Sequence, residues 1–342
     1  MDFGLTAVPA RCDCRQISDT NPNSPIQNPK LKKGTLIFNP VAGRRPDRRE
    51  REVHEAAAVL RRAGLEIELA PTARADMAHE LAQAAVQNGA DVIFACGGDG
   101  TINEVINGLA ASTVPLGILP GGTANILAHE LRLPLHPVSA ARQYARWKPR
   151  LIALGRASWG NASNGAATAE HAGRSNSRYY ITVAGVGYDA HVVYKLSPWL
   201  KKNLGVAGYV LEALHQWATY CFPRFSCRMD GREKVATFSV IHRTRLYAGW
   251  LHMAPTADLY APHFAVCSFP SRNRMLYLVY ALGVLLRQHL RINGVSLDQC
   301  QEVVCAAVDN CETIRFELDG ELGGELPVTF EIVPDALTLL GP

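Results

Sequence analysis

The stretch ACGGDGTINEVINGL, residues 95–109, decides the fold. The apolar residues at 90–96 (ADVIFAC) predict a buried strand that runs into it, and the spacing of apolar residues over 101–110 predicts a helix that follows. Thr101 and Glu104 have the Thr-x-x-Glu spacing of a capping box, which predicts that the helix begins at Thr101. The stretch is therefore a strand, a glycine-rich turn and a helix in direct succession.

The turn itself is suited to an anion. Gly97, Gly98 and Gly100 allow close approach of the backbone to a ligand, and the helix N-terminus adds the positive end of a dipole. Asp99 is costly beside a phosphate unless a cation or a hydroxyl proton is handled there, as magnesium–nucleotide chemistry requires. The alternative is a plain turn and helix cap with no ligand.

Two further loops repeat this arrangement. In GILPGGTANILAHEL, residues 117–131, an apolar strand ends in a glycine turn before a helix predicted at 123–131. In IFNPVAGRR, residues 37–45, the first strand ends in another glycine-containing loop. Loops at the carboxyl ends of neighbouring parallel strands are where open α/β sheets bind ligands, so the three together favour a binding site.

Outward from these loops, residues 34–149 alternate short apolar strands with amphipathic helices, two of them at 47–63 and 75–88. This alternation predicts a Rossmann-like parallel α/β domain. Residues 1–33 are rich in Pro, Asn and Ser and are expected to be a disordered N-terminal extension.

Residues 150–342 have a different pattern of short strands bounded by turns, which predicts a C-terminal antiparallel β-sandwich domain. Two helices are expected within it, at 196–217 and 275–290. The Ala/Gly/Ser/Asn-rich segment 158–177 is expected to be a flexible loop between two strands.

Composition excludes several classes of protein. The 342 residues are 48% hydrophobic and 19% charged, a globular composition of about two domains, and the net charge of +4 is too small to indicate nucleic acid. The apolar run at 275–286 is shorter than the roughly 20 residues that span a bilayer. The nine cysteines include no Cys-x-x-Cys pair, and the N-terminus has no secretory pattern, so a cytoplasmic location is expected.

These residues resemble a known family. NPVAG, GGDGTINEVINGL and GILPGGTANILAHEL are similar to the nucleotide-binding loops of the diacylglycerol kinase catalytic-domain family, and the likeness continues in VAGVGYDAHVV, LKKNLGVAGYVLEAL and FELDGELGG. It covers roughly residues 34–340. The resemblance implies ATP and Mg²⁺, phosphorylation of a lipid hydroxyl on a diacylglycerol or sphingoid-like acceptor, and a role in lipid metabolism and phospholipid biosynthesis. It also implies that the active site lies between the two domains.

The resemblance also assigns site residues. Glu321 matches the proton acceptor, Asp99 is expected to organise the magnesium-bound phosphates, and Asp189 and Asp319 are supporting carboxylates. From the sequence alone, Asp319-Gly320 is a hairpin turn signal, beside which a charged residue is usually solvated. The expected nucleotide contacts are Asn39, Pro40, Val41, Ala42, Gly43, Thr72, Gly97, Gly98, Asp99, Gly100, Thr101, Ile102, Asn103, Glu104, Gly122, Thr123 and Asn125.

One element departs from the family pattern. Family members carry an Asp-Asp-Gly sequence that binds a structural magnesium, but this chain has Tyr260, Ala261 and Pro262 there, with Asp258 out of register. A hard cation needs several oxygen ligands, so this metal site is expected to be lost or rebuilt. Two alternatives stay open: a catalytically weak lipid- or nucleotide-binding protein, and an NAD kinase, which shares the Gly-Gly-Asp-Gly turn.

Charge is unevenly distributed. Residues 271–291 contain Arg272, Arg274, Arg287 and Arg291 and no acidic residue around an apolar run, and Lys195, Lys201 and Lys202 flank Trp199. Apolar helices edged by basic residues suit an anionic membrane surface, although an ordinary core helix with a solvated edge has the same pattern. The expected partners are a lipid substrate, an anionic membrane surface at the inner face of the membrane, and a second copy in a homodimer.

Overall fold

The computed structural model describes residues 31–41, 46–74, 76–110, 112–160, 176–197, 199–200, 204–308 and 313–342. Most of the expected N-terminal extension and most of the expected loop at 158–177 lie outside the described residues, as do Ala42, Gly43, Lys201 and Lys202.

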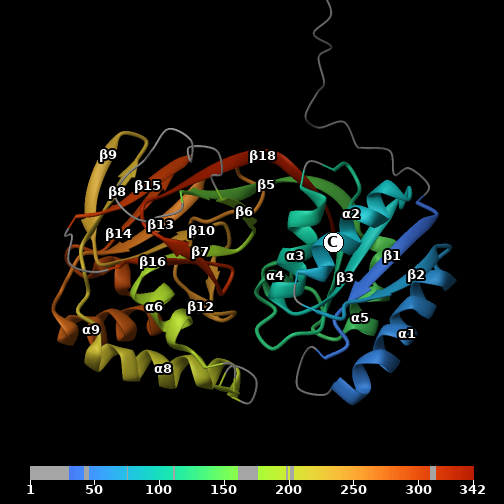
Figure 1. Ribbon diagram of the computed structural model, residues 1–342, viewed down its shortest axis with the longest axis horizontal. Coiled ribbons are helices and arrows are strands. Elements are labelled where there is room, and N and C mark those ends of the chain that lie inside the picture. The colour runs from blue at the N-terminus through green and yellow to red at the C-terminus, as the bar shows by residue number, and fades with distance from the viewer. Residues whose placement is uncertain are drawn as a thin grey trace, which may run out of the picture.

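The first half of the chain forms a parallel sheet with helices packed around it (Figure 1). The four strands pair in the order β2-β1-β3-β4, and β3 and β4 are buried along their whole length, which explains their continuous apolar sequences. Helix α1 packs against α5, and α2 packs against α3. The elements are β1 (Lys33–Phe38), α1 (Pro46–Arg62), β2 (Glu66–Pro71), α2 (Met77–Gln87), β3 (Val92–Gly97), α3 (Asp99–Leu109), β4 (Leu116–Pro120), α4 (Ile126–Glu130), α5 (Pro137–Ala141) and η1 (Tyr144–Arg146).

Two helix starts differ from the prediction. Helix α3 begins at Asp99 rather than Thr101, with Gly98 as an extended N-cap that makes no side-chain cap bond. The capping box does not form, because the Glu104 carboxylate instead accepts a hydrogen bond from the backbone N–H of Ala78 at 3.0 Å. Helix α4 begins only at Ile126, because Asn125 has a left-handed backbone (φ 48°) that interrupts the predicted helix.

The second half is an antiparallel β-sandwich, as predicted. Phe225 and Phe330 from one sheet meet Phe264 and Phe316 from the other in a shared apolar core. One sheet contains β5 (Lys148–Trp159), β6 (Asn176–Tyr180), β8 (Phe225–Met229), β9 (Arg232–Ala236), β15 (Glu302–Ala307) and β18 (Val328–Gly341). The other contains β7 (Val183–Gly187), β10 (Phe238–His242), β13 (Phe264–Phe269), β14 (Ser296–Cys300), β16 (Arg315–Leu318) and β17 (Glu321–Glu325). A small ribbon of β11 (Leu246–Tyr247) and β12 (Leu251–His252) lies apart from both.

The helices of this half cover the outer face of the second sheet, where Tyr277 and Tyr280 pack with Phe222 and Phe269. They are α6 (Tyr188–Lys195), α8 (Val206–Thr219), α9 (Arg274–Leu285) and the short η2 (His289–Arg291). The sequence prediction missed α6, and the single helix predicted at 196–217 is interrupted, because Gly205 (φ 54°) separates α8 from helical residues before it. Within the described ranges, no helix combines the length and the apolar content needed to cross a membrane.

Two long strands join the halves. Strand β18 pairs with β5 along almost its whole length, with one irregularity between Val333 and Leu337. Its last residues also pair in parallel with β4, so that Leu339 lies beside Leu116. The parallel sheet therefore continues into the antiparallel one, and β5 and β18 run across both halves (Figure 1).

Candidate active site

The glycine turns after β3 and β4 lie directly against each other. A side chain added to Gly122 would have its Cβ 2.4 Å from the Cα of Gly98, so position 122 has no room for anything larger than hydrogen, and a Cβ on Gly98 would lie 3.3 Å from the Cα of Gly122. In the second turn, the Asn125 amide accepts a hydrogen bond from the N–H of Gly122 at 2.8 Å and donates one to its carbonyl oxygen at 3.0 Å. Two of the three predicted loops therefore form one continuous backbone surface beside the start of α3.

Asp99 connects these two turns. Its Oδ1 accepts a hydrogen bond from the N–H of Ile126 at 2.8 Å, at the start of α4. Burial raises the pKa of this carboxyl to about 6, and the nearby charge of Asp319 acts in the same direction. Asp99 is thus a structural link as well as a carboxylate at the turn that the sequence predicts to bind an anion.

Glu321 reaches this turn from the opposite half of the molecule. Asp319 (φ 52°) and Gly320 (φ 83°) form the tight turn between β16 and β17, as the sequence predicts, and Glu321 pairs with Leu318 immediately after it. A Cβ on Gly100 would lie 2.5 Å from Oε1 of Glu321. The carboxylate therefore sits directly over the first turn of α3.

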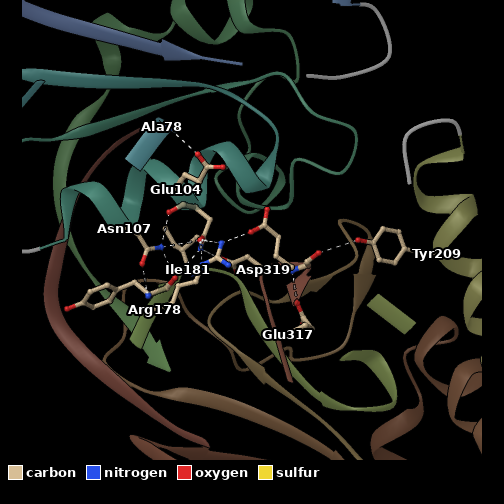
Figure 2. A network of polar contacts seen from close by, with 12 residues as sticks. Ala78, Glu104, Asn107, Arg178, Ile181, Tyr209, Glu317 and Asp319 are labelled. Carbon is tan, nitrogen blue, oxygen red and sulfur yellow. Dashed lines mark hydrogen bonds and ion pairs between the residues drawn. The ribbon is translucent and has the colours of Figure 1, made fainter. Parts of the chain in front are cut away.

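A buried polar network holds the hairpin against α3 (Figure 2). The amide of Asn103 on α3 donates to Oδ2 of Asp319 at 2.7 Å. The Asp319 carboxylate also accepts bonds from the N–H groups of Ile181, Thr182 and Val183 and from the Thr182 hydroxyl. Asp319 is therefore satisfied by the protein itself, and its role is to fix the hairpin that carries Glu321.

Arg178 completes the network and was not identified from the sequence. Its guanidinium donates to Oε2 of Glu321 at 2.5 Å and, through Nε and Nη2, to Oδ1 of Asn103 at 3.1 and 2.8 Å. The alternation of Arg178-Tyr179-Tyr180 indicates a strand, but nothing in it indicates a partner in residue 321.

A second acidic pair lies behind the hairpin. Asp189 on α6 accepts a hydrogen bond from the Tyr247 hydroxyl at 2.5 Å and also lies in hydrogen-bond contact with Glu317. Burial, followed by the charge of Asp189, holds the pKa of Glu317 well above its ordinary range. Two carboxylates this close cannot both be ionised in a buried site, so the pair retains a proton. The sequence pointed to Asp189 but not to Glu317 or Tyr247.

The remaining predicted contacts are spread around the turns. Thr72 is buried and donates its N–H to Phe38, and the Asn39 side chain accepts from the N–H of Val41 at 3.0 Å. Thr101 and Asn103 are buried, Asn39 and Pro40 are partly exposed, and Val41 and Thr123 are exposed. The Ile102 side chain is buried in the α/β core, so a ligand could meet only its backbone.

Two carboxylates at the turn, those of Asp99 and Glu321, could take part in holding a metal ion. Within the described part of the chain, no group of three or more His, Cys, Asp or Glu side chains is placed to hold a metal ion. Magnesium, however, is commonly held by substrate phosphates, waters and only one or two carboxylates. Asp99 and Glu321, on either side of Gly100, are the carboxylates at this position.

The structural magnesium of the family does not fit this chain. The loop at 258–263 surrounds the guanidinium of Arg243, which is fully buried, and burial lowers its pKa to about 10. This guanidinium donates to the carbonyl oxygens of Ala153 (3.1 Å), Leu259 (2.6 Å), Ala261 (2.8 Å) and His263 (2.6 Å). The Asp258 carboxylate accepts from the N–H of Tyr260 within its own turn. The loop's inward carbonyl groups are thus already bound to a protein cation.

Each half of the chain matches the model of a known protein family. Residues 33–157 match the family model of the diacylglycerol kinase catalytic domain, and residues 182–341 match that of the YegS C-terminal NAD kinase beta sandwich-like domain. The chain is 27% identical over 305 residues to a diacylglycerol kinase of Bacillus subtilis (strain 168), covering 88% of this chain and 93% of the relative. It is 26% identical over 321 residues to a diacylglycerol kinase of Mycobacterium tuberculosis (strain ATCC 25618 / H37Rv), covering 93% and 97%.

The fold is also that of solved structures. A diacylglycerol kinase from Bacillus anthracis str. Sterne aligns with a TM-score of 0.68 at 20% identity, covering 92% of this chain and 98% of that one. A second structure from the same organism aligns with a TM-score of 0.73 at 20% identity, covering 92% and 96%.

Proposed function

Because the chain belongs to the diacylglycerol kinase catalytic-domain family, we propose that it transfers the γ-phosphate of ATP to the hydroxyl of a lipid, a diacylglycerol or a sphingoid-like acceptor. The observation that carries the proposal is the position of Glu321 over Gly100. A carboxylate from the β-sandwich here meets a helix N-terminus and two glycine turns from the α/β half, a combination that suits transfer from a phosphate to an alcohol.

In this proposal the two glycine turns bind the phosphates through backbone N–H groups. Asn39 and Thr72 contact the nucleotide on the side of β1. Magnesium arriving with the nucleotide would neutralise phosphate charge. Asp99 holds the two turns together and faces the same phosphates. Positioning and charge complementarity are the contributions expected of a kinase site.

In this proposal Glu321 accepts the proton of the lipid hydroxyl. The lipid oxygen attacks the γ-phosphorus, the bond from that phosphorus to the ADP oxygen breaks, and the hydroxyl proton passes to the Glu321 carboxylate. Oε1, which lies toward Gly100, is the oxygen that accepts this proton, because Oε2 is bound to Arg178.

The test is transfer of radiolabelled phosphate from ATP to diacylglycerol, sphingosine and NAD. We expect a lipid product, a fall of about 100-fold or more in kcat for E321Q, and near-wild-type activity for the control E325Q on the same strand. Phosphorylation of NAD instead would favour the NAD kinase alternative. Nucleotide binding without any transfer would favour the catalytically weak binding protein.

A lipid acceptor also implies a membrane partner, and the outer face of α8 and α9 supports one. The two helices are held side by side, since the Trp217 indole donates to the carbonyl of Arg274 at 2.6 Å and the Arg274 guanidinium donates to that of Ala218 at 2.5 Å (Figure 1). The exposed α8–α9 face consists of Val210, Leu211, Leu214, Met275, Leu278, Val279, Leu282, Leu285 and Leu286, each 40–59% exposed.

The α8–α9 face differs from the outer side of an ordinary core helix, because it is apolar. The inner side of α9 is already buried through Tyr277 and Tyr280, so its outer side is a second apolar surface where polar residues would be usual. The exposed basic residues around it are Lys195, Arg272, Arg274, Arg287 and Arg291. Apolar residues ringed by positive charge are complementary to an anionic bilayer, which we take as the partner, at the cytoplasmic face of the membrane.

A further inference from the structure

The ion pair between Arg178 and Glu321 lies at the junction of the two halves. Arg178 comes from β6 and is about one quarter exposed, and Glu321 begins β17 and is about one third exposed. Their 2.5 Å contact is accompanied by bonds from the same guanidinium to Asn103, a side chain buried on α3. Arg178 therefore touches both the helix at the anion site and the carboxylate above it.

Glu321 creates an electrostatic problem at this position. Its carboxylate lies over Gly100, within the turn that is suited to bind phosphate, and unpaired negative charge there would repel a triphosphate. The carboxylate of Glu104 is near enough for the charge of Glu321 to help, after burial, to raise the pKa of Glu104. A cation bound to Glu321 removes much of this repulsion.

The geometry also fixes which oxygen of Glu321 is available. Arg178 binds Oε2, and Oε1 faces Gly100. Because Asn103 accepts two N–H groups of the guanidinium and is itself bound to Asp319, the guanidinium cannot rotate without breaking the buried network shown in Figure 2. A planar, forked donor is needed for such a bridge, and lysine cannot reproduce it.

We infer that Arg178 is a positioning residue for the proposed kinase reaction, which directs Oε1 of Glu321 to the reacting hydroxyl and neutralises this carboxylate so that magnesium–ATP binds beside it. The inference rests on the proposed function. It gives Arg178 two separable effects: one on nucleotide affinity, through charge, and one on turnover, through orientation.

The experiment is a double-mutant cycle on nucleotide affinity, measured by calorimetry with magnesium and a non-hydrolysable ATP analogue in the full chain. We expect R178M to weaken binding about tenfold, the order expected for a carboxylate left unpaired near the phosphates. In an E321Q background the same change should have less than about a twofold effect, because the charge to be neutralised is gone. R178K should bind nearly as wild type yet lose turnover on the lipid.

R156M is the matched control, because Arg156, on the strand β5 next to β6, forms a comparable ion pair with Glu331 on β18. It should leave both affinity and turnover unchanged. Equal losses from R178M with and without E321Q, or full turnover in R178K, would overturn the inference while leaving the kinase proposal standing. A wild-type chain that binds the analogue but phosphorylates no lipid would refute the kinase proposal, and the inference with it.

Discussion

The Asp99 carboxylate is a structural hydrogen-bond acceptor and is also proposed to face the phosphates. Its carboxylate accepts the N–H of Ile126 and so ties α4 to the first glycine turn. The same burial that makes this bond possible disfavours its charge and raises its pKa from 3.8 to about 6. A carboxylate proposed to face phosphates is therefore ionised at neutral pH only at a cost to the fold.

That cost is measurable as pH-dependent stability. The folded chain holds a proton on Asp99 up to about pH 6, whereas the unfolded chain releases it near pH 3.8. Stability from this site is therefore fully present below pH 3.8 and is lost as the pH rises through 6, by about 3 kcal/mol in all. In urea unfolding from pH 4 to 7, D99N, which retains the acceptor oxygen, should gain stability over the wild type as the pH rises. A difference between the two that does not change with pH would contradict the assignment.

At the scale of the element, the loop at 258–263 is organised by Arg243 in place of a metal. Five carbonyl groups, from Ala153, Asp258, Leu259, Ala261 and His263, are bound by one guanidinium. A buried carbonyl that loses its donor is costly, so the loop depends on this single side chain.

We accordingly expect EDTA to leave the melting temperature unchanged while it abolishes magnesium-dependent turnover. R243M should lower the free energy of unfolding by about 3 kcal/mol or more, because its partners are left unsatisfied. The control R51M removes an exposed ion pair with Glu55 and should cost about 1 kcal/mol or less. A clear fall in melting temperature with EDTA would show that the loop binds metal after all.

The sequence could predict features that depend on neighbouring residues, but not contacts between residues far apart in the chain. The turns at 97–101 and 319–320 are local, since glycine and the alternation of strand residues mark them directly, and the structure has both. The bonds from Arg178 to Glu321 and from Arg243 to the loop carbonyls join residues whose sequence context is that of ordinary strand and loop. The capping box failed because Glu104 found a partner in α2, a tertiary contact that overrides a local signal.

At the scale of the whole molecule, the α8–α9 face and the hairpin that carries Glu321 are two sides of one layer. Tyr209 on α8 donates from its hydroxyl to the carbonyl of Gly320 at 3.4 Å, next to Glu321. A bilayer in contact with the outer side of α8 would lie within about one helix diameter, roughly 10 Å, of this hairpin. The lipid hydroxyl would then travel only a short distance to the site.

Sedimentation with vesicles tests this arrangement. The wild type should bind phosphatidylglycerol-containing vesicles at low salt and release them at high salt, and L278E combined with L282E should bind at least about tenfold more weakly. L135E, at a similarly exposed leucine in the α/β half, is the control and should bind normally. Unchanged vesicle binding in the double variant would refute the docking face. A dimer that becomes monomeric without any change in vesicle binding would identify the face as a contact between copies.

The pairing of β18 with β4 has a consequence for how the protein is made. The α/β half is the first to leave the ribosome, yet Leu337, Leu339 and Leu340 in the last strand are part of its apolar core. Domains commonly fold in order of synthesis, N-terminal first, but here the free edge of β4 stays open until β18 has been made. A nascent chain therefore carries an unpaired strand edge until β18 emerges, and a chain cut short before β18 has an α/β half whose sheet is not closed.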